Sequence, residues 1–204
     1  MLILLISTME AASKKQGRHV ISSQELVDVA ARAKRYEPDA LARLFDLYFE
    51  KLRRYMYYKT GNLDRAEDLA AEALTRGIES IEKFEDRGGT IGAWLFGIAR
   101  NLLARERESD GRAEMVELEE RFPAEEEEQP EKILLVELSH EELYEALSRL
   151  PDEQREVVLL RFMEGYDVKT VAQIIAKKPG AVRALQFRAV RALQKMYEPG
   201  GVET

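Results

Sequence analysis

Apolar residues recur every three or four positions in segment after segment of this 204-residue chain, and this helical period is what most limits its fold. The strongest example begins at Pro38 and continues to a break near Gly61. Its regularly spaced apolar residues are Leu41, Leu44, Phe45, Tyr48, Phe49, Leu52, Tyr55 and Met56. No segment shows the two-residue alternation typical of strands. The pattern predicts an all-α protein, with the aromatic residues of this helix in its core.

A second helix is predicted between Asn62 and Lys83. Asp64 is its expected N-cap, because Glu67 follows three residues later in the arrangement that satisfies two free backbone N–H groups. The predicted buried face holds Ala66, Leu69, Ala70, Ala73, Leu74, Gly77, Ile78 and Ile81. The polar face holds Glu67, Asp68, Glu72, Arg76 and Glu79. Such an acidic face is ordinarily solvated, and a partner-binding surface is the alternative.

The glycine-rich run EDRGGTIG predicts a loop that ends at Thr90, the expected N-cap of a third helix. The following stretch, AWLFGIARNLLARER, is apolar at first and then basic, which leaves Arg100, Arg105 and Arg107 available to phosphates. Trp94 is the only tryptophan of the chain. In this setting we expect a core anchor rather than a base-stacking platform.

Acidic residues are concentrated after this third helix. Residues 104–132 hold five Lys or Arg and twelve Asp or Glu, and 5 − 12 = −7 equals the formal net charge of the whole chain. Four consecutive glutamates, Glu125 to Glu128, lie between Pro123 and Pro130. This composition predicts a flexible acidic linker between two small helical domains. The rest of the chain is balanced, so a basic patch on it can act locally.

The second half predicts a helix-turn-helix. A helix through Leu138 and Leu147 breaks at Pro151, and another follows up to Gly165. Asp167 then caps a short helix, and a turn at residues 176–178 leads into a longer one. In this arrangement the second helix enters the major groove of DNA.

The stretch from Lys177 to Tyr197 combines an apolar stripe with charge of one sign. Pro179 fits the first turn of a helix, where its missing N–H is not needed. The predicted core-facing stripe is Val182, Leu185, Gln186, Ala189, Leu193 and Met196. The remaining surface carries Lys177, Lys178, Arg183, Arg188, Arg191 and Lys195 without an acidic residue. A helix that lies against phosphates needs this charge pattern.

Composition excludes several other classes. The chain has no cysteine, so disulfides and thiolate metal sites are absent, and His19 and His140 are too far apart in sequence to suggest a metal site. We therefore expect no metal, no cofactor and no small-molecule substrate. Acid pairs such as Glu67 with Asp68 lie on an exposed helix without a neighbouring histidine, so we expect no enzyme.

The apolar start, MLILLIS, is too short for a signal peptide or a membrane span, which predicts a cytoplasmic protein that does not enter the membrane. Met9 is an alternative translation start.

The order of these segments resembles the extracytoplasmic-function (ECF) sigma factors, which are specificity subunits of bacterial RNA polymerase. LFDLYFEKLRRYMYYKTGN, DRAEDLAAEAL and FEDRGGTIGAWLFGIARNLLARER resemble successive parts of sigma domain 2. ALSRLPDEQREVVLLRFMEGYDVKTVAQIIAKKPGAVRALQFRAVRALQKM resembles sigma domain 4. The resemblance implies domain 2 at residues 38–108, an acidic linker at 109–132 and domain 4 at 133–198, with an N-terminal extension at 1–37 and a tail at 199–204.

The resemblance also implies roles for named residues in a non-enzymatic initiation factor. The acidic helix would bind the clamp helices of core RNA polymerase through Asp64, Glu67, Asp68, Glu72 and Arg76. The minus-ten promoter element would be held by Lys83, Arg87, Trp94, Arg100, Asn101 and Arg105. The minus-thirty-five element would be read by Lys177, Lys178, Arg183, Ala184, Phe187, Arg188 and Arg191. The linker would thread toward the RNA-exit channel, and an anti-sigma factor would be a further partner.

Some positions depart from the usual pattern of this family. Ala176 stands where a turn glycine is common, Lys178 where a serine or threonine often caps the helix, and Lys169 where an acidic residue is usual. Phe187 is a large apolar residue on the face assigned to DNA, where it could contact thymine methyl groups. Two other functions stay open on the sequence alone: a helix-turn-helix regulator that does not need polymerase, and a helical adaptor that binds only proteins.

Overall fold

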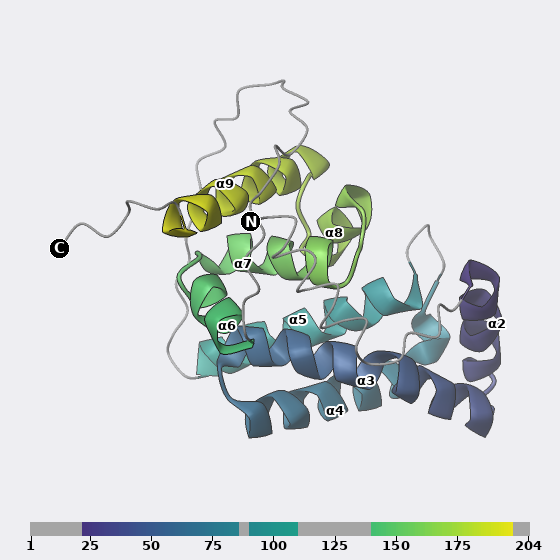
Figure 1. Ribbon diagram of the computed structural model, residues 1–204. Helices are drawn as coiled ribbons and strands as arrows, with labels where there is room; N and C mark the ends of the chain where they lie inside the picture. Colours follow the sequence, from purple (N-terminus) through teal and green to yellow (C-terminus); the bar gives the residue numbers. More distant parts are fainter. Residues whose placement is uncertain (1–21, 86–89, 110–139, 198–204) are drawn as a thin grey trace. The chain divides into compact units, whose positions relative to one another are not determined.

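The computed structural model describes residues 22–85, 90–109 and 140–197, and within these ranges every regular element is a helix (Figure 1). This confirms the predicted all-α class. The helices form two compact units, one with α2 to α5 and the other with α6, α7, η2, most of α8, and α9. Of the predicted acidic linker, residues 110–132 lie outside the described ranges. No helix among the described residues is long and apolar enough to cross a membrane.

The first unit is organised by a helical hairpin. Its elements are α2 (Ser23–Ala33), α3 (Pro38–Thr60), α4 (Leu63–Glu79), the short 3₁₀ helix η1 (Ile81–Lys83) and α5 (Ile91–Ser109). α3 ends at Gly61, which has a left-handed backbone (φ 72°) and lets the chain turn back into α4. α3 and α4 pack along each other, α5 packs on both, and α2 packs on α3.

The apolar stripe of α3 forms the centre of this unit. Leu44, Leu52 and Met56 are buried, and the Tyr55 ring meets the Phe96 ring of α5 edge-on, with 5.3 Å between centroids. The prediction of a core position was wrong for Phe45, which is 45% exposed and stacks on Phe49 with 4.7 Å between ring centroids. The apolar stripe of α3 is wider than the face that its neighbours cover.

α4 begins two residues earlier than predicted. The Asn62 side chain caps the helix by accepting a hydrogen bond from the backbone N–H of Arg65 (2.9 Å), so Asp64 is not the N-cap. Asparagine caps a helix about as well as aspartate does, and the turn at Gly61 places Asn62 at the start. Asp64 lies in the first turn instead, where its negative charge is favourable near the positive end of the helix dipole.

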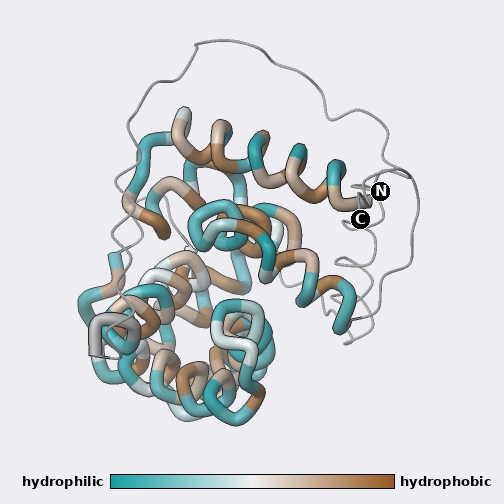
Figure 2. The backbone as a smooth tube through the Cα atoms, turned by 90° about the vertical axis from the view of Figure 1, so that its left-hand side faces the viewer, coloured by the Kyte–Doolittle hydropathy of each residue, from teal (hydrophilic) through white to brown (hydrophobic). Residues whose placement is uncertain are grey.

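The second unit consists of short helices packed under one long helix. Its elements are α6 (His140–Ser148), α7 (Asp152–Val158), the π-helical turn η2 (Leu159–Met163), α8 (Val168–Ile174) and α9 (Pro179–Tyr197). The predicted cap of α8 is confirmed, because an Asp167 carboxylate oxygen accepts from the Thr170 backbone N–H at 2.7 Å. Figure 2 shows hydrophobic and hydrophilic residues alternating along the helices, as expected of amphipathic helices that each bury one side.

The core of this unit comes from every one of its helices. Its members are Leu143, Leu147, Val157, Leu160, Val171, Val182, Leu185 and Leu193, all of them buried.

Ionisation of Tyr58 is expected to lower the stability of the first unit at alkaline pH. Its side chain is buried, and burial raises the pKa of Tyr58 to about 12, whereas a tyrosine in an unfolded chain titrates near about 10. The folded state therefore holds this proton more tightly. Its stabilising contribution is complete below about pH 10 and is lost as pH rises toward about 12, by roughly 3 kcal/mol in total.

We expect Tyr58→Phe to make the free energy of unfolding fall less steeply above about pH 10 than in the wild type. Urea unfolding between pH 8 and pH 11.5 measures this. Tyr36→Phe is the matched control, because Tyr36 is 45% exposed. Equal pH slopes for the wild type and Tyr58→Phe would contradict the assignment.

Gly77 is required by the close approach of α4 and α5. A Cβ atom at this position would lie 2.4 Å from the Leu95 Cδ2 atom, whereas a Cβ atom at Gly97 of α5 would meet nothing within 4 Å. Leu95 is buried, so it has to change rotamer inside the core. We expect Gly77→Ala to lower the free energy of unfolding by about 1–2 kcal/mol. Gly97→Ala should raise it by up to about 1 kcal/mol, and urea unfolding tests both.

Candidate functional site

The predicted helix-turn-helix is present in the second unit. α8 ends at Ile174, and α9 begins at Pro179. The backbone N–H of Lys177 donates to the Ala172 carbonyl (2.9 Å), which closes the turn. Ala176 has a left-handed backbone (φ 54°), a conformation that costs a residue with a Cβ atom about 1 kcal/mol or more. Ala176, which stands where the family commonly has a turn glycine, is therefore strained.

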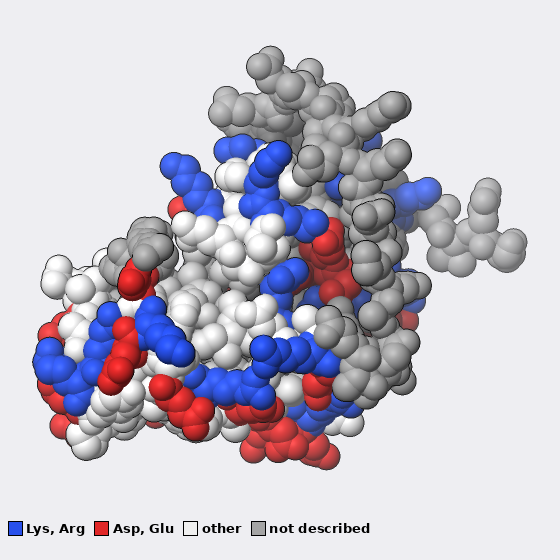
Figure 3. Space-filling model, turned by 180° about the vertical axis from the view of Figure 1, so that it is seen from behind, with Lys and Arg blue, Asp and Glu red and all other residues white. Residues whose placement is uncertain are grey.

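The outer face of α9 presents the basic residues that the sequence predicted. Arg183, Phe187, Arg188 and Arg191 are exposed, whereas Val182 and Leu185 are buried. The guanidinium of Arg191 lies over the Phe187 ring, 5.6 Å from its centroid, and Phe187 is still 54% exposed. In Figure 3, Lys and Arg side chains stand out in the upper part of the view, at the height of α9. Buried and exposed residues thus alternate with the helical period, and the exposed ones between Gly180 and Tyr197 are cationic or aromatic.

The other three predicted minus-thirty-five residues, Lys177, Lys178 and Ala184, differ in how exposed their side chains are. The Lys177 ammonium pairs with the Glu153 carboxylate of α7 at 2.9 Å, and both side chains are about two thirds buried. Lys178 is exposed at the start of α9, and Ala184 is half-buried. Part of the charge of Lys177 is therefore neutralised within the fold, which leaves Lys178 as the more available cation at this end of the helix.

The acidic face of α4 is on the surface of the first unit. Asp64, Glu67, Asp68 and Glu72 are exposed, and Arg76 is half-buried. The Arg76 guanidinium pairs with Glu72 at 2.5 Å, one helical turn away. Because Glu72 and Arg76 neutralise each other, the negative potential of the face comes mainly from the exposed Asp64, Glu67, Asp68 and Glu79.

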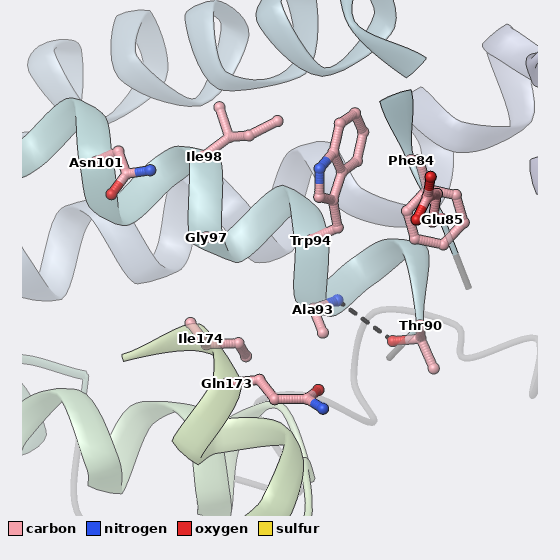
Figure 4. Close-up of a pocket in the computed structure, with 10 residues that line it drawn as sticks. All are labelled: Phe84, Glu85, Thr90, Ala93, Trp94, Gly97, Ile98, Asn101, Gln173 and Ile174. Atoms are coloured by element: carbon pink, nitrogen blue, oxygen red, sulfur yellow. Dashed lines mark hydrogen bonds between the residues drawn. The ribbon is translucent and has the colours of Figure 1, made fainter. Parts of the chain in front are cut away.

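The start of α5 brings several predicted minus-ten residues onto one helix. The Thr90 hydroxyl accepts from the Ala93 backbone N–H (3.2 Å), which confirms the predicted cap (Figure 4). Trp94 is half-buried and lies against Phe84 with 5.5 Å between rings, so it is partly an anchor and partly surface. Figure 4 shows Asn101 farther along the same helix.

The remaining residues predicted to hold the minus-ten element vary in exposure. Lys83, Asn101 and Arg105 are exposed, and Arg100 is half-buried. Arg87 lies outside the described residues.

Sequence reasoning missed one polar contact beside α9. The Arg161 guanidinium donates to the Gln186 side-chain oxygen at 3.0 Å. The sequence placed Gln186 in the apolar stripe, and Arg161 lies within the apolar run LLRFM. One polar residue in each of two apolar runs was the available signal for such a pair.

No group of three or more His, Cys, Asp or Glu among the described residues is arranged to hold a metal ion.

Comparison with known proteins identifies both units. A family model described as Sigma-70 region 2 matches residues 44–113, and one described as Sigma-70, region 4 matches residues 140–193. The ECF RNA polymerase sigma factor EcfG of Rhodopseudomonas palustris is 32% identical over 152 residues, which cover 74% of this chain and 82% of EcfG. The chain belongs to the ECF family of RNA polymerase sigma factors.

Other ECF sigma factors and solved structures agree with this. BldN of Streptomyces coelicolor is 39% identical over 85% of this chain, which spans 66% of the length of BldN. SigD of Mycobacterium tuberculosis is 29% identical, with 85% of this chain and 84% of SigD covered. The sigma factor RpoE in its complex with the anti-sigma factor NepR from Bartonella quintana has a TM-score of 0.61 and 25% identity, and the match covers 78% of this chain and 97% of RpoE.

The sigma-factor matches follow the two units of the structure. The region 2 match includes most of α3 and all of α4 and α5, and the region 4 match includes α6 to α8 and most of α9. A regulator made only of a helix-turn-helix would have no use for the first of these. The family therefore accounts for the acidic α4 and the basic α9 in one chain.

A glycine in place of Ala176 should relieve the backbone strain in the turn before α9. We expect Ala176→Gly to raise the free energy of unfolding by about 1 kcal/mol, because glycine adopts φ near 54° without a Cβ clash. Ala192→Gly, within α9, should lower it by a similar amount. Thermal unfolding of the full chain compares the two variants. A loss of stability in Ala176→Gly would show that the turn is not strained.

Proposed function

We propose that this ECF sigma factor binds core RNA polymerase through its first unit, reads promoter DNA with both units and directs transcription initiation. The observation that carries this is the pairing, in one chain, of a region 2 unit with an acidic α4 and a region 4 unit with a basic α9. It acts as a binding factor rather than as an enzyme, and it works in the cytoplasm.

The acidic α4 face is the proposed polymerase-binding surface. Asp64, Glu67 and Asp68 are exposed on one helix that is anchored by its buried Ala70 and Leu74. Exposed charges at the edge of a binding surface speed association and favour a partner of opposite charge. The partner surface would therefore be basic, and binding should weaken as salt concentration rises.

The α5 helix with its preceding loop is the proposed minus-ten reader. Trp94 presents part of an aromatic ring beside Phe84, and Asn101 and Arg105 are exposed farther along the helix. Unstacked single-stranded bases are bound by such a combination of aromatic surface, hydrogen-bonding side chains and cations. Lys83 and Arg87 before the helix, and Arg100 on it, complete the proposed set.

The α9 helix is the proposed minus-thirty-five reader. Lys178 directly precedes this helix, and Arg183, Ala184 and Phe187 lie in its N-terminal half, the end that a recognition helix inserts into the major groove. Arg188 and Arg191 lie farther along and suit phosphate contacts, with Lys177 a weaker contributor because Glu153 already pairs with it. Arginine can read guanine, and the Phe187 ring can contact thymine methyl groups.

An anti-sigma protein is a further proposed partner. One similar solved structure is the sigma factor RpoE in complex with the anti-sigma factor NepR, and another is CnrH in complex with the cytosolic domain of CnrY. CnrH is 17% identical to this chain and supports the fold alone.

Transcription with purified components tests the whole proposal. Full-length protein is added to core RNA polymerase on fragmented genomic DNA of its host, and transcript starts are mapped by sequencing. We expect new starts that share two upstream sequence elements and that are absent with core enzyme alone. Starts without a shared element, or no binding to core enzyme, would overturn the proposal.

Two substitutions should separate the two binding activities. Asp68→Lys should weaken binding to core polymerase by roughly tenfold, because it reverses one charge of the acidic α4 face. Arg183→Ala should leave core binding intact and cost promoter binding about 1–3 kcal/mol. Glu141→Lys, an exposed charge reversal on α6, is the matched control. Core binding and promoter binding are measured separately, and an equal loss of core binding in Arg183→Ala would refute the assignment.

A further inference from the structure

Arg161 lies where three elements of the second unit meet. It is in the π-helical turn η2, and its Nε donates to the Gln186 side-chain oxygen of α9 at 3.0 Å. Another nitrogen of the same guanidinium donates to the backbone carbonyl of Tyr166, in the loop before α8. Arg161 also interacts electrostatically with Asp167, the cap of α8. One planar side chain therefore joins η2, the start of α8 and α9.

The surroundings make this contact specific rather than incidental. Arg161 and Gln186 are both half-buried, and Leu160 and Leu185, their neighbours in the chain, are buried. Burial lowers the pKa of Arg161, and the nearby Asp167 carboxylate opposes that shift. If Gln186 moved away, the half-buried guanidinium would lose a hydrogen-bond acceptor without regaining water, which costs free energy. This hydrogen bond, in addition to packing, therefore holds Gln186 in position.

The rotation of α9 about its own axis decides which residues it presents. Its buried stripe is Val182, Leu185, Ala189 and Leu193. The side chain of Ala189 is too small to interlock with the side chains of a neighbouring helix. Gln186 lies at the edge of this stripe, three residues after Arg183 and one before Phe187. Successive residues of a helix are held at fixed angles of about 100° to each other. A small rotation of α9 about its axis would therefore move Arg183 and Phe187 together.

We propose that the Arg161–Gln186 hydrogen bond positions the recognition helix, setting the rotation of α9 at which Arg183 and Phe187 meet the bases. This inference rests on the proposed promoter-reading function. Arg161 acts through Gln186 and is a positioning residue that need not contact DNA. A π-helical turn next to a binding element fits this role, since such turns occur often at functional sites. Supporting contacts of this kind hold a binding surface in its productive geometry.

A purely stabilising contact would behave differently from a positioning one. When both partners of a buried polar pair are replaced by apolar residues of similar size, stability is often kept or improved. The apolar pair has no directional bond, so the helix rotation would be less sharply defined. The double variant Arg161→Met/Gln186→Leu therefore separates stability from sequence preference.

The experiment uses full-length protein with core polymerase on a duplex library. The library carries the downstream part of a promoter found by start mapping and a randomised upstream segment, and bound and unbound DNA are sequenced. The measured quantity is the affinity for the best upstream sequence relative to the library average. Thermal unfolding of each free variant is measured in parallel. Arg149→Met is the control, because it removes one cation from the turn after α6, where Arg149 pairs with Glu145, instead of from η2.

We expect Gln186→Leu alone to lower both the unfolding temperature and the sequence preference. The double variant should regain the unfolding temperature of the wild type, while its preference stays roughly tenfold lower. Arg149→Met should keep the full preference. If the double variant keeps the wild-type preference, Arg161 has only a structural role and the inference is wrong.

Gln186→Glu covers the case in which the double variant does not fold. Glutamate keeps an acceptor for Arg161, so this variant should keep the preference that Gln186→Leu loses, and an equal loss in both would overturn the inference. If wild-type protein prefers no upstream sequence, the proposed reading function fails and the inference fails with it. A wild-type preference that survives in the double variant removes the positioning role alone.

Discussion

Burial of one apolar stripe on each helix is the constraint on which the rest of this structure depends. In α3, Leu44, Leu52 and Met56 face α4 and α5, and in α9, Val182, Leu185 and Leu193 face the short helices of the second unit. Because a helix is rigid about its axis, burying one side decides which residues the other side presents. The acidic face of α4 and the basic face of α9 are consequences of what lies beneath them.

Charge is divided between these faces in a way that net charge conceals. A formal charge of −7 argues against DNA binding until it is located along the chain, where residues 104–132 account for all of it. The exposed part of α9 carries Arg183, Arg188 and Arg191, and the exposed part of α4 carries Asp64, Glu67 and Asp68. At physiological salt each face acts over about 8 Å, so each can serve its own partner.

Local capping and turn chemistry were predictable where one residue type suits the position. Thr90 and Asp167 cap their helices as expected. Ala176 stands where the family commonly has a turn glycine, and it has the left-handed backbone that favours glycine. At the start of α4, two residues of similar capping strength, Asn62 and Asp64, competed, and the turn at Gly61 decided between them. Periodicity also overestimated the core at Phe45, because it reports which residues are apolar and not how far neighbouring helices extend.

The amino-acid sequence by itself determined the helical class, the family and the composition of each functional face, because periodicity, capping residues and charge are properties of neighbouring residues. The tertiary structure decided which of those side chains are available. It pairs Lys177 with Glu153 and Glu72 with Arg76, and it brings Arg161 to Gln186 across 25 residues of sequence. Such contacts depend on how helices pack against each other, and no pattern within one helix contains that information.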